Sequence, residues 1–128
     1  MASELKVDKF TGVTTAGSIV VTGEGNSTTT NLQQGLCKMW ARLNGQGTIA
    51  LNDSFNVGSI TDNATGQYTY TFSNNMNNAN FNVAHDSGNQ MQIHSLSSTS
   101  SVRSLNRDGS NSDEDATPAF SNVHGDLA

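Results

Sequence analysis

Charged side chains are scarce in this chain of 128 residues. Lys, Arg, Asp and Glu make up 13% of it, against about 25% in an average globular protein. The net charge is only −5 and proline occurs once, which excludes disorder driven by charge. Residues typical of coiled coils are also few, whereas Asn, Thr and Gly, which disfavour helix interiors, are abundant. The composition therefore predicts a β-rich protein with many uncharged loops.

Other absences exclude whole classes of protein. The single cysteine, Cys37, cannot form an internal disulfide, so a disulfide-stapled secreted domain is excluded. No apolar run reaches the roughly 18 to 20 residues of a membrane span, and residues 1–10 lack the apolar core of a secretory signal. Six basic residues scattered along a chain of pI 4.8 argue against a nucleic-acid footprint. We expect neither nucleic-acid binding nor membrane insertion.

Large apolar side chains are few as well. Leu, Ile, Val and Phe total 25 residues, about 20% of the chain, which is the lower border for filling a core. A domain of about 90 residues with this composition buries little surface alone, and its short strands leave sheet edges to be covered. We therefore expect self-association, and analogy with polar, β-rich fibre tips suggests a homotrimer.

The composition changes near residue 35, and residues 1–35 form a predicted N-terminal docking arm and linker. Two short β-like pieces precede a low-complexity stretch, 23–31, that is typical of a loop. The arm has too few apolar residues to fold alone, so we expect it to add a strand to the sheet edge of a partner. Its candidate docking residues are Leu5, Val7, Phe10, Ile19, Val20 and Val21.

Residues 36–128 carry strand signals at intervals of about ten residues. Apolar and polar residues alternate over 49–57, after a tight turn predicted at 44–47, and Asp53 interrupts the apolar face, which predicts a β-bulge or a local partner. Besides 37–43 and 49–57, the expected strands are 68–72, 81–83, 91–93, 102–105 and 118–124, with only a short helix within 30–42. About seven strands predict an all-β fold: a small antiparallel β-sandwich or meander, preceded by the extended N-terminal arm.

Aromatic residues make up only 6% of the chain, so we assign the Tyr68–Tyr70–Phe72 ladder to the core and not to a carbohydrate platform. Trp40 shares a strand face with Lys38 and Arg42, opposite Met39 and Leu43. Stacking on one of these cations, own-chain packing and a subunit contact remain open for Trp40. The full set of core or subunit-interface candidates is Trp40, Phe55, Tyr68, Tyr70, Phe72 and Phe81.

No constellation of residues points to catalysis. His85, Asp86 and Ser87 are adjacent in sequence, whereas catalytic triads converge from separate elements, and the Gly-x-Ser-x-Gly elbow is absent. The three histidines lack the spacing of a zinc site, the acidic loop 106–115 lacks the order of a calcium loop, and Cys37 lacks a cationic cluster that would activate it. We expect no enzymatic activity, no metal and no cofactor.

Polar loops offer a second class of function, the binding of a host receptor or surface glycan. The segments 61–66, 74–79, 86–89 and 106–117 are rich in Asn, Ser and Asp, as adaptable binding loops often are. A polysaccharide-cleaving enzyme would need two facing carboxylates, and Asp53 and Asp62 fit a bulge and a turn better. The candidate binding residues of the loops are Asn63, Asn75, Asn77, Asp86, Asn89 and Asp113.

The block 47–72, which runs from Gly-Thr-Ile-Ala-Leu-Asn-Asp-Ser-Phe to Gln-Tyr-Thr-Tyr-Thr-Phe, resembles a module of tail-fibre-like virion structural proteins of marine tailed phages, of the cyanophage and pelagiphage type. Residues 3–9, 76–81 and 123–126 are similar to flanking parts of that class. The resemblance implies a virion surface component that is oligomeric and not catalytic. We therefore expect a trimeric capsid decoration, short spike or fibre, docked through its arm to a capsid or tail protein. The alternative is a tail-fibre tip that binds a host receptor or glycan.

Overall fold

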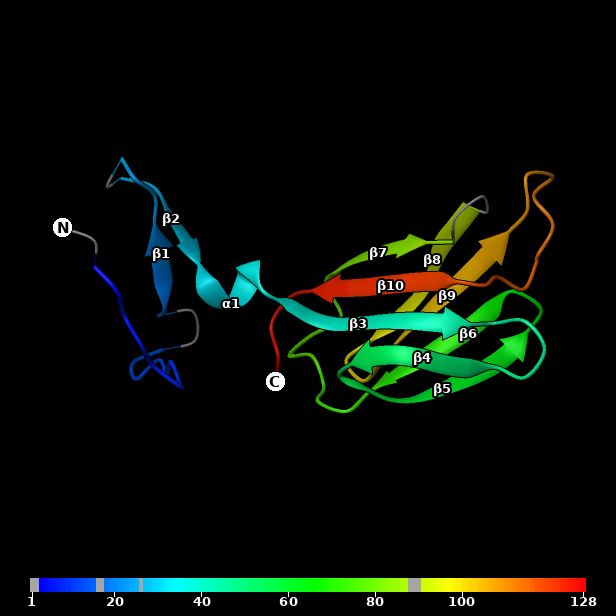
Figure 1. Cartoon of the computed structure of the whole chain (residues 1–128), viewed down its shortest axis with the longest axis horizontal. Helices are drawn as coiled ribbons and strands as arrows, with labels where there is room; N and C mark the ends of the chain where they lie inside the picture. Colours follow the sequence, from blue (N-terminus) through cyan, green and yellow to red (C-terminus); the bar gives the residue numbers. More distant parts are fainter. Residues whose placement is uncertain (1–2, 16–17, 26, 88–90) are drawn as a thin grey trace. The chain divides into compact units, whose positions relative to one another are not determined.

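The computed structural model describes residues 3–15, 18–25, 27–87 and 91–128, with the backbone alone for 91–95. The chain divides into two compact units, Met1–Gly35 and Leu36–Ala128, both drawn in Figure 1. The division falls where the composition of the sequence changes. Within the described part of the chain, no helix is both long and apolar enough to cross a membrane.

The N-terminal unit contains a two-stranded antiparallel hairpin and one helical turn. Strand β1 (Val20–Thr22) pairs with β2 (Thr29–Asn31), and α1 (Leu32–Gly35) follows directly. Asn31 caps this turn, because its Oδ1 accepts a hydrogen bond of 3.1 Å from the backbone nitrogen of Gln34. The expectation of a loop throughout 23–31 was wrong for β2, since the segment folds back far enough to pair with β1. The other predicted β-like piece, over residues 5–10, belongs to no sheet in the described structure.

The second unit is a sandwich of two antiparallel sheets, which lie one behind the other in Figure 1. The first sheet has the order β4-β3-β10-β7 and the second β5-β6-β9-β8. In the described structure, the eight strands of the two sheets together are β3 (Cys37–Asn44), β4 (Ala50–Phe55), β5 (Val57–Ala64), β6 (Gln67–Phe72), β7 (Asn82–Asp86), β8 (Met91–Ser98), β9 (Ser101–Arg107) and β10 (Ala119–His124). The predicted all-β, antiparallel fold class is confirmed.

One more strand forms than the sequence predicts, because the alternating segment 49–57 breaks at Asn56. The backbone of Asn56 has φ 58°, a left-handed conformation that Asn tolerates better than most residues. Its Nδ2 donates to the carbonyl oxygens of Lys38 (2.9 Å) and Asn74 (3.0 Å), and its Oδ1 accepts from the nitrogen of Asn74 (2.7 Å). These bonds fix a corner at which the chain passes from the first sheet to the second.

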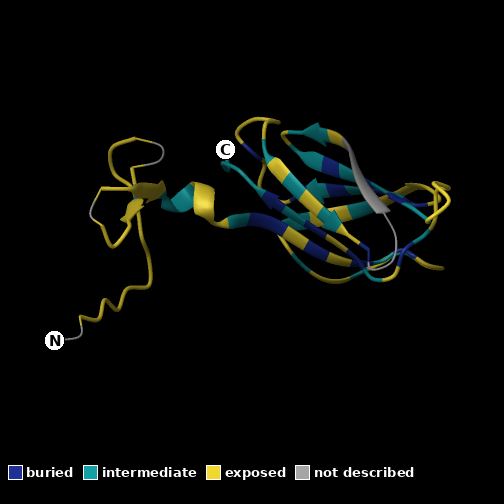
Figure 2. Ribbon diagram, turned by 90° about the horizontal axis from the view of Figure 1, so that it is seen from above, coloured by how far each residue is buried: buried dark blue, intermediate teal, exposed yellow. Residues whose placement is uncertain are grey.

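The core lies between the sheets and consists of side chains from alternate positions. Figure 2 shows this alternation of buried and exposed residues along the strands. Tyr68, Tyr70 and Phe72 of β6 face Met39, Ala41 and Leu43 of β3, and smaller residues of β9 and β10 fill the remaining space. The buried apolar set is Met39, Ala41, Leu43, Tyr68, Tyr70, Phe72, Met76, Val102, Ala116, Ala119 and Val123.

The edge strands of the sandwich carry irregularities. The pairing of β4 with β3 skips Asn52, next to Asp53, where the sequence predicts a bulge. The edge strand β5 skips Gly58 and Asn63, and the edge strand β8 skips Ser95. Bulges twist an edge and hinder the pairing of further strands. Three of the four edges are therefore poor templates for another chain.

Candidate functional site

The apolar side chains of the N-terminal unit face solvent. Leu5, Val7 and Phe10 are 73%, 47% and 61% exposed, and Val20 and Val21 are exposed as well. Ile19 is half-buried, and its carbonyl oxygen accepts a bond from the nitrogen of Leu32 (2.9 Å). None of the described residues of this unit is buried. The unit thus has no core of its own.

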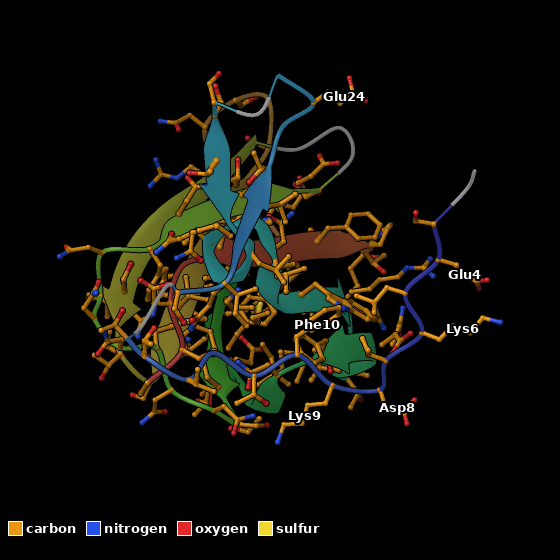
Figure 3. The ribbon with its side chains drawn as sticks, turned by 90° about the vertical axis from the view of Figure 1, so that its left-hand side faces the viewer. Glu4, Lys6, Asp8, Lys9, Phe10 and Glu24 are labelled. Carbon is orange, nitrogen blue, oxygen red and sulfur yellow. The ribbon has the colours of Figure 1, made fainter. Side chains whose placement is uncertain are left out.

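Charged and apolar side chains alternate over residues 4–8, which lie outside every helix and strand and end at a bend at Asp8. Lys6 and Glu4 form an ion pair of 3.4 Å, which two residues of an extended segment can do because they point to the same side. Leu5 and Val7 occupy the intervening positions. Figure 3 shows the charged side chains of this segment projecting from the ribbon. The segment has the pattern of a strand with one polar and one apolar side but belongs to no sheet.

Tyr68, Tyr70 and Phe72 lie inside the sandwich and are unavailable to a ligand. Tyr68 and Tyr70 are fully buried and Phe72 nearly so. Phe81, another interface or core candidate, is half-buried and packs edge-on against Phe72 with the ring centroids 5.8 Å apart. These four aromatic residues are therefore structural.

The hydroxyl of Tyr68 ties the core to the acidic loop. Its oxygen lies 2.9 Å from Oδ1 of Asp115 and 3.1 Å from the carbonyl oxygen of Gly45. The same Oδ1 accepts a bond of 2.7 Å from the nitrogen of Gly66. Burial, and next the hydrogen bond to Asp115, raise the pKa of Tyr68 well above its usual range. The structure thus assigns Asp115 a role that the sequence analysis missed, because its partners are distant in sequence.

A second polar group lies between the sheets. Nδ1 of His85 lies 2.7 Å from Oγ of Ser121, and burial raises the pKa of the neighbouring Tyr70, an effect that the hydroxyls of Ser121 and Ser104 oppose. Ser121, Tyr70 and Ser104 are at most 2% exposed. A Ser–His contact resembles part of a catalytic dyad, but no substrate can reach a serine enclosed in this way. The group is part of the interior.

Trp40 and Phe55 lie on the outer face of the first sheet and not in the core. Trp40 is 40% and Phe55 51% exposed, and they are direct neighbours across β3 and β4. Phe120 of β10, 38% exposed, joins them on this face. The sequence analysis missed Phe120, although the small and apolar residues at 119, 121 and 123 imply that 120 points outward.

The expected face of Lys38 was wrong, and of the alternatives left open for Trp40, stacking on a cation is not the one found among the described residues. Lys38 does not share the face of Trp40, because it is the extra residue of a bulge opposite Val123 and His124 and is 4% exposed. Its Nζ donates to the carbonyl oxygen of Leu36 (2.9 Å), and burial lowers its pKa. The arginine of this face, Arg42, lies over the ring of Phe120, with Cζ 6.0 Å from the centroid, and not over Trp40.

The predicted binding loops are only partly loops. Asn63 lies in β5, where its Nδ2 donates to Oγ1 of Thr69 (2.8 Å) and its Oδ1 accepts from Arg103 (3.3 Å), so the expectation of a loop there was wrong. Asp86 likewise lies on a strand, at the end of β7.

Three more candidate residues lie in loops, and one is not described. Asp113 forms an ion pair of 2.9 Å with Arg107. Asn75 and Asn77 are exposed in the loop after β6, which Met76 anchors by its burial. Asn89 lies outside the described residues. The candidates are therefore spread over the sandwich, and no single cluster of loops contains them.

Chemistry at a metal or a reactive thiol finds no support in the described residues. They contain no group of three or more His, Cys, Asp or Glu that could hold a metal ion. The half-buried thiol of Cys37 donates to the carbonyl oxygen of Met39 (2.9 Å).

Comparisons with protein-family models, curated proteins and solved structures find no match to this chain.

Proposed function

We propose that the chain is a non-enzymatic structural protein of a phage virion, a surface appendage whose N-terminal unit attaches it to a capsid or tail protein. The observation that carries the proposal is the contrast between the two units. The first exposes nearly all its apolar side chains, whereas the second encloses a core of its own. The virion as the location rests on the resemblance of residues 47–72 to tail-fibre-like proteins.

Strand addition is the binding mode that suits the N-terminal segment best. Residues 3–7 belong to no helix, strand or turn, and a bend follows at Asp8. Charged and apolar side chains alternate over residues 4–8. A segment of this kind adds to an open sheet edge through main-chain hydrogen bonds, while Leu5 and Val7 enter pockets of the partner. The charged side, with the Glu4–Lys6 pair, then stays in water.

In this proposal the homotrimer forms through the N-terminal units, and not through the core and sheet edges of residues 36–128 from which the sequence analysis expects self-association. Bulges at three of the four sheet edges of the sandwich oppose edge-to-edge association. In contrast, exposed apolar side chains on a unit without a core favour association. Light scattering on the full chain is then expected to give three times the chain mass of 13.5 kDa, and residues 36–128 alone are expected to be monomeric.

The first experiment locates the protein on the particle. An antibody raised against residues 36–128 is applied to purified virions of the phage that encodes the chain, with gold-labelled detection by electron microscopy. Label on the capsid supports a decoration or short spike, and label on the tail supports a fibre. Virions that carry no label, and no copies of the chain by mass spectrometry, would refute the proposal.

The second experiment tests the attachment. Tagged copies are expressed during infection and their incorporation into virions is measured. The double variant Leu5→Ser, Val7→Ser, which alters only the apolar side of residues 4–8, is expected to be excluded. The matched control Lys6→Ser, Asp8→Ser alters the other side of the same segment without changing the net charge, and it is expected to be incorporated normally. Equal incorporation of both variants would show that the apolar side does not attach the protein.

A further inference from the structure

The outer face of the first sheet presents a regular array of side chains. The strand registers place Phe55, Trp40, Asn122 and Ala84 in one row across β4, β3, β10 and β7. They place Asp53, Arg42, Phe120 and Asp86 in the next row. Strands lie about 4.8 Å apart and successive outward residues about 7 Å apart. These eight residues, called the aromatic face below, thus cover an area of about 14 Å by 7 Å between Cα atoms.

The aromatic rings of this face are half-open. Trp40, Phe55 and Phe120 retain 38–51% of their surface in contact with solvent. Large apolar side chains are scarce in the chain, and three of the largest lie on the outer face of the first sheet. Exposed apolar patches with a polar rim mark interaction sites.

The polar groups of the aromatic face indicate what covers it. Arg42 is exposed, and among the described residues it makes no ion pair, although Asp53 is its direct cross-strand neighbour. Its guanidinium lies over Phe120, and its N–H donors remain available at the rim of the ring. Asp53 is exposed, and its Oδ1 accepts a bond of 2.8 Å from the nitrogen of Ser54, which leaves its other oxygen as an acceptor.

We propose that the aromatic face binds a neutral glycan, with pyranose rings stacked on Trp40 and Phe55 and hydroxyl groups bonded to Arg42, Asp53 and Asn122. The C–H side of a sugar ring is apolar and packs on the aromatic faces. Its hydroxyls both donate and accept, so a single ligand satisfies a guanidinium and a carboxylate at once. Trp40 and Arg42 are successive outward residues of β3, about 7 Å apart, a spacing that suits an extended chain of sugars.

The charged residues of the aromatic face favour a neutral glycan over a protein partner and over an acidic polysaccharide. A protein partner would desolvate Arg42 on the central strand β3, between Asp53 and Asp86 on the two edge strands. Charged residues are depleted from the centres of protein interfaces. An acidic polysaccharide would meet two carboxylates and one guanidinium on a chain of net charge −5. A neutral glycan avoids both costs. This inference does not depend on what the N-terminal unit binds.

Trp40 provides the measurement, because it is the single tryptophan of the chain. The full-length protein is titrated with cellohexaose, maltohexaose, mannohexaose and the acidic hexagalacturonate while tryptophan emission is recorded. We expect a saturable change with at least one neutral hexasaccharide, at a dissociation constant of about 1 mM or tighter, and a weaker response to hexagalacturonate. No saturable change with any neutral hexasaccharide, or tighter binding of the acidic one, would overturn the proposal.

Variants assign the binding to the aromatic face. Phe55→Ala removes a stacking ring, and Phe120→Ala removes the ring beneath the Arg42 guanidinium. Both keep the fluorescent reporter and change exposed residues, so each should fold and bind about tenfold more weakly. The control Leu96→Ala removes an exposed apolar side chain from β8 of the other sheet and should bind like the unaltered chain. Unchanged affinity in both phenylalanine variants would contradict the assignment.

The same reporter detects the competing occupant, a second copy of the chain. If a second copy covers the aromatic face, iodide quenches Trp40 poorly in the concentrated protein and efficiently once dilution lowers the mass measured by light scattering. This result would also overturn the proposal. Efficient quenching at all concentrations supports a face open to ligands.

Discussion

Replacement of Tyr68 by Phe tests the link between the core and the acidic loop. The substitution removes one hydroxyl and leaves the buried ring in place, so no large cavity forms. The lost hydrogen bond joins Tyr68 to Oδ1 of Asp115 at 2.9 Å. Hydrogen bonds to charged groups contribute about 1.5–3 kcal/mol, and Asp115 keeps its bond to the nitrogen of Gly66, so no carboxylate is stranded.

We therefore expect Tyr68→Phe to lower the free energy of unfolding by about 1.5–3 kcal/mol. For a domain of this size each kcal/mol lowers the melting temperature by roughly 4–8 °C. The assay is urea denaturation of the full chain followed by circular dichroism. The dependence of the unfolding free energy on urea concentration should remain the same, because the surface exposed on unfolding is unchanged.

Tyr70→Phe is the matched control. Tyr70 lies two residues away on the same strand and is equally buried. Its hydroxyl lies near those of Ser121 and Ser104 but makes no hydrogen bond of standard geometry to them or to another described residue. Removal of a buried hydroxyl without a partner is close to neutral or stabilising. The reasoning fails if Tyr70→Phe destabilises the protein as much as Tyr68→Phe does, or if neither variant changes stability.

Three further predictions concern the ionisation of the core, the corner between the sheets and the independence of the sandwich. Both tyrosines of the chain have a raised pKa, so their contribution to stability is complete below about pH 10 and is lost as the pH rises above it. Tyrosinate absorbance should therefore appear only together with alkaline unfolding. Ionisation of the tyrosines near pH 10 in the folded protein would contradict their burial. Asn56→Ala should lower the free energy of unfolding by about 2–4 kcal/mol, because alanine is strained in the left-handed conformation and the side-chain hydrogen bonds are lost. Asn56→Gly loses the same hydrogen bonds but adopts this conformation without strain, so its loss should be smaller. Equal losses in urea denaturation would show that the strain is negligible. Deletion of residues 1–35 should change the unfolding free energy of the sandwich by less than about 1 kcal/mol, and a larger loss by the same assay would show that the first unit completes the core.

The sequence predicts a strand well where one face of the strand is apolar and the other is polar. Tyr68, Tyr70 and Phe72 alternate with threonine and glutamine, so strand and inner face follow from one pattern. Bulges limit this reasoning. Lys38 is turned inward because one extra residue of β3 faces β10, and nothing in its local sequence distinguishes it from a residue of the outer face.

Contacts between segments that are distant in sequence also could not be predicted from the local pattern of residues. Asp115 looks like one more residue of an acidic loop until the fold brings it to Tyr68 and Gly66. The aromatic face depends in the same way on the order β4-β3-β10-β7, which places Phe120 beside Arg42. A strand order that joins the first and last strands of a domain cannot be derived from hydrophobic periodicity.

The distribution of apolar side chains favours binding as the role of this protein. A chain with few large apolar residues gains most stability by burying all of them, since each contributes roughly 1.5–3 kcal/mol when buried. This chain instead exposes Leu5 and Phe10 in the first unit, and Trp40 and Phe55 on one face of the sandwich. The core closes without them, because tyrosines and small residues fill it. The two proposed occupants would cover these surfaces. They are a protein partner on residues 3–10, which belong to no sheet, and a hydroxyl-rich ligand on the aromatic face, where Arg42 and Asp53 lie beside the rings.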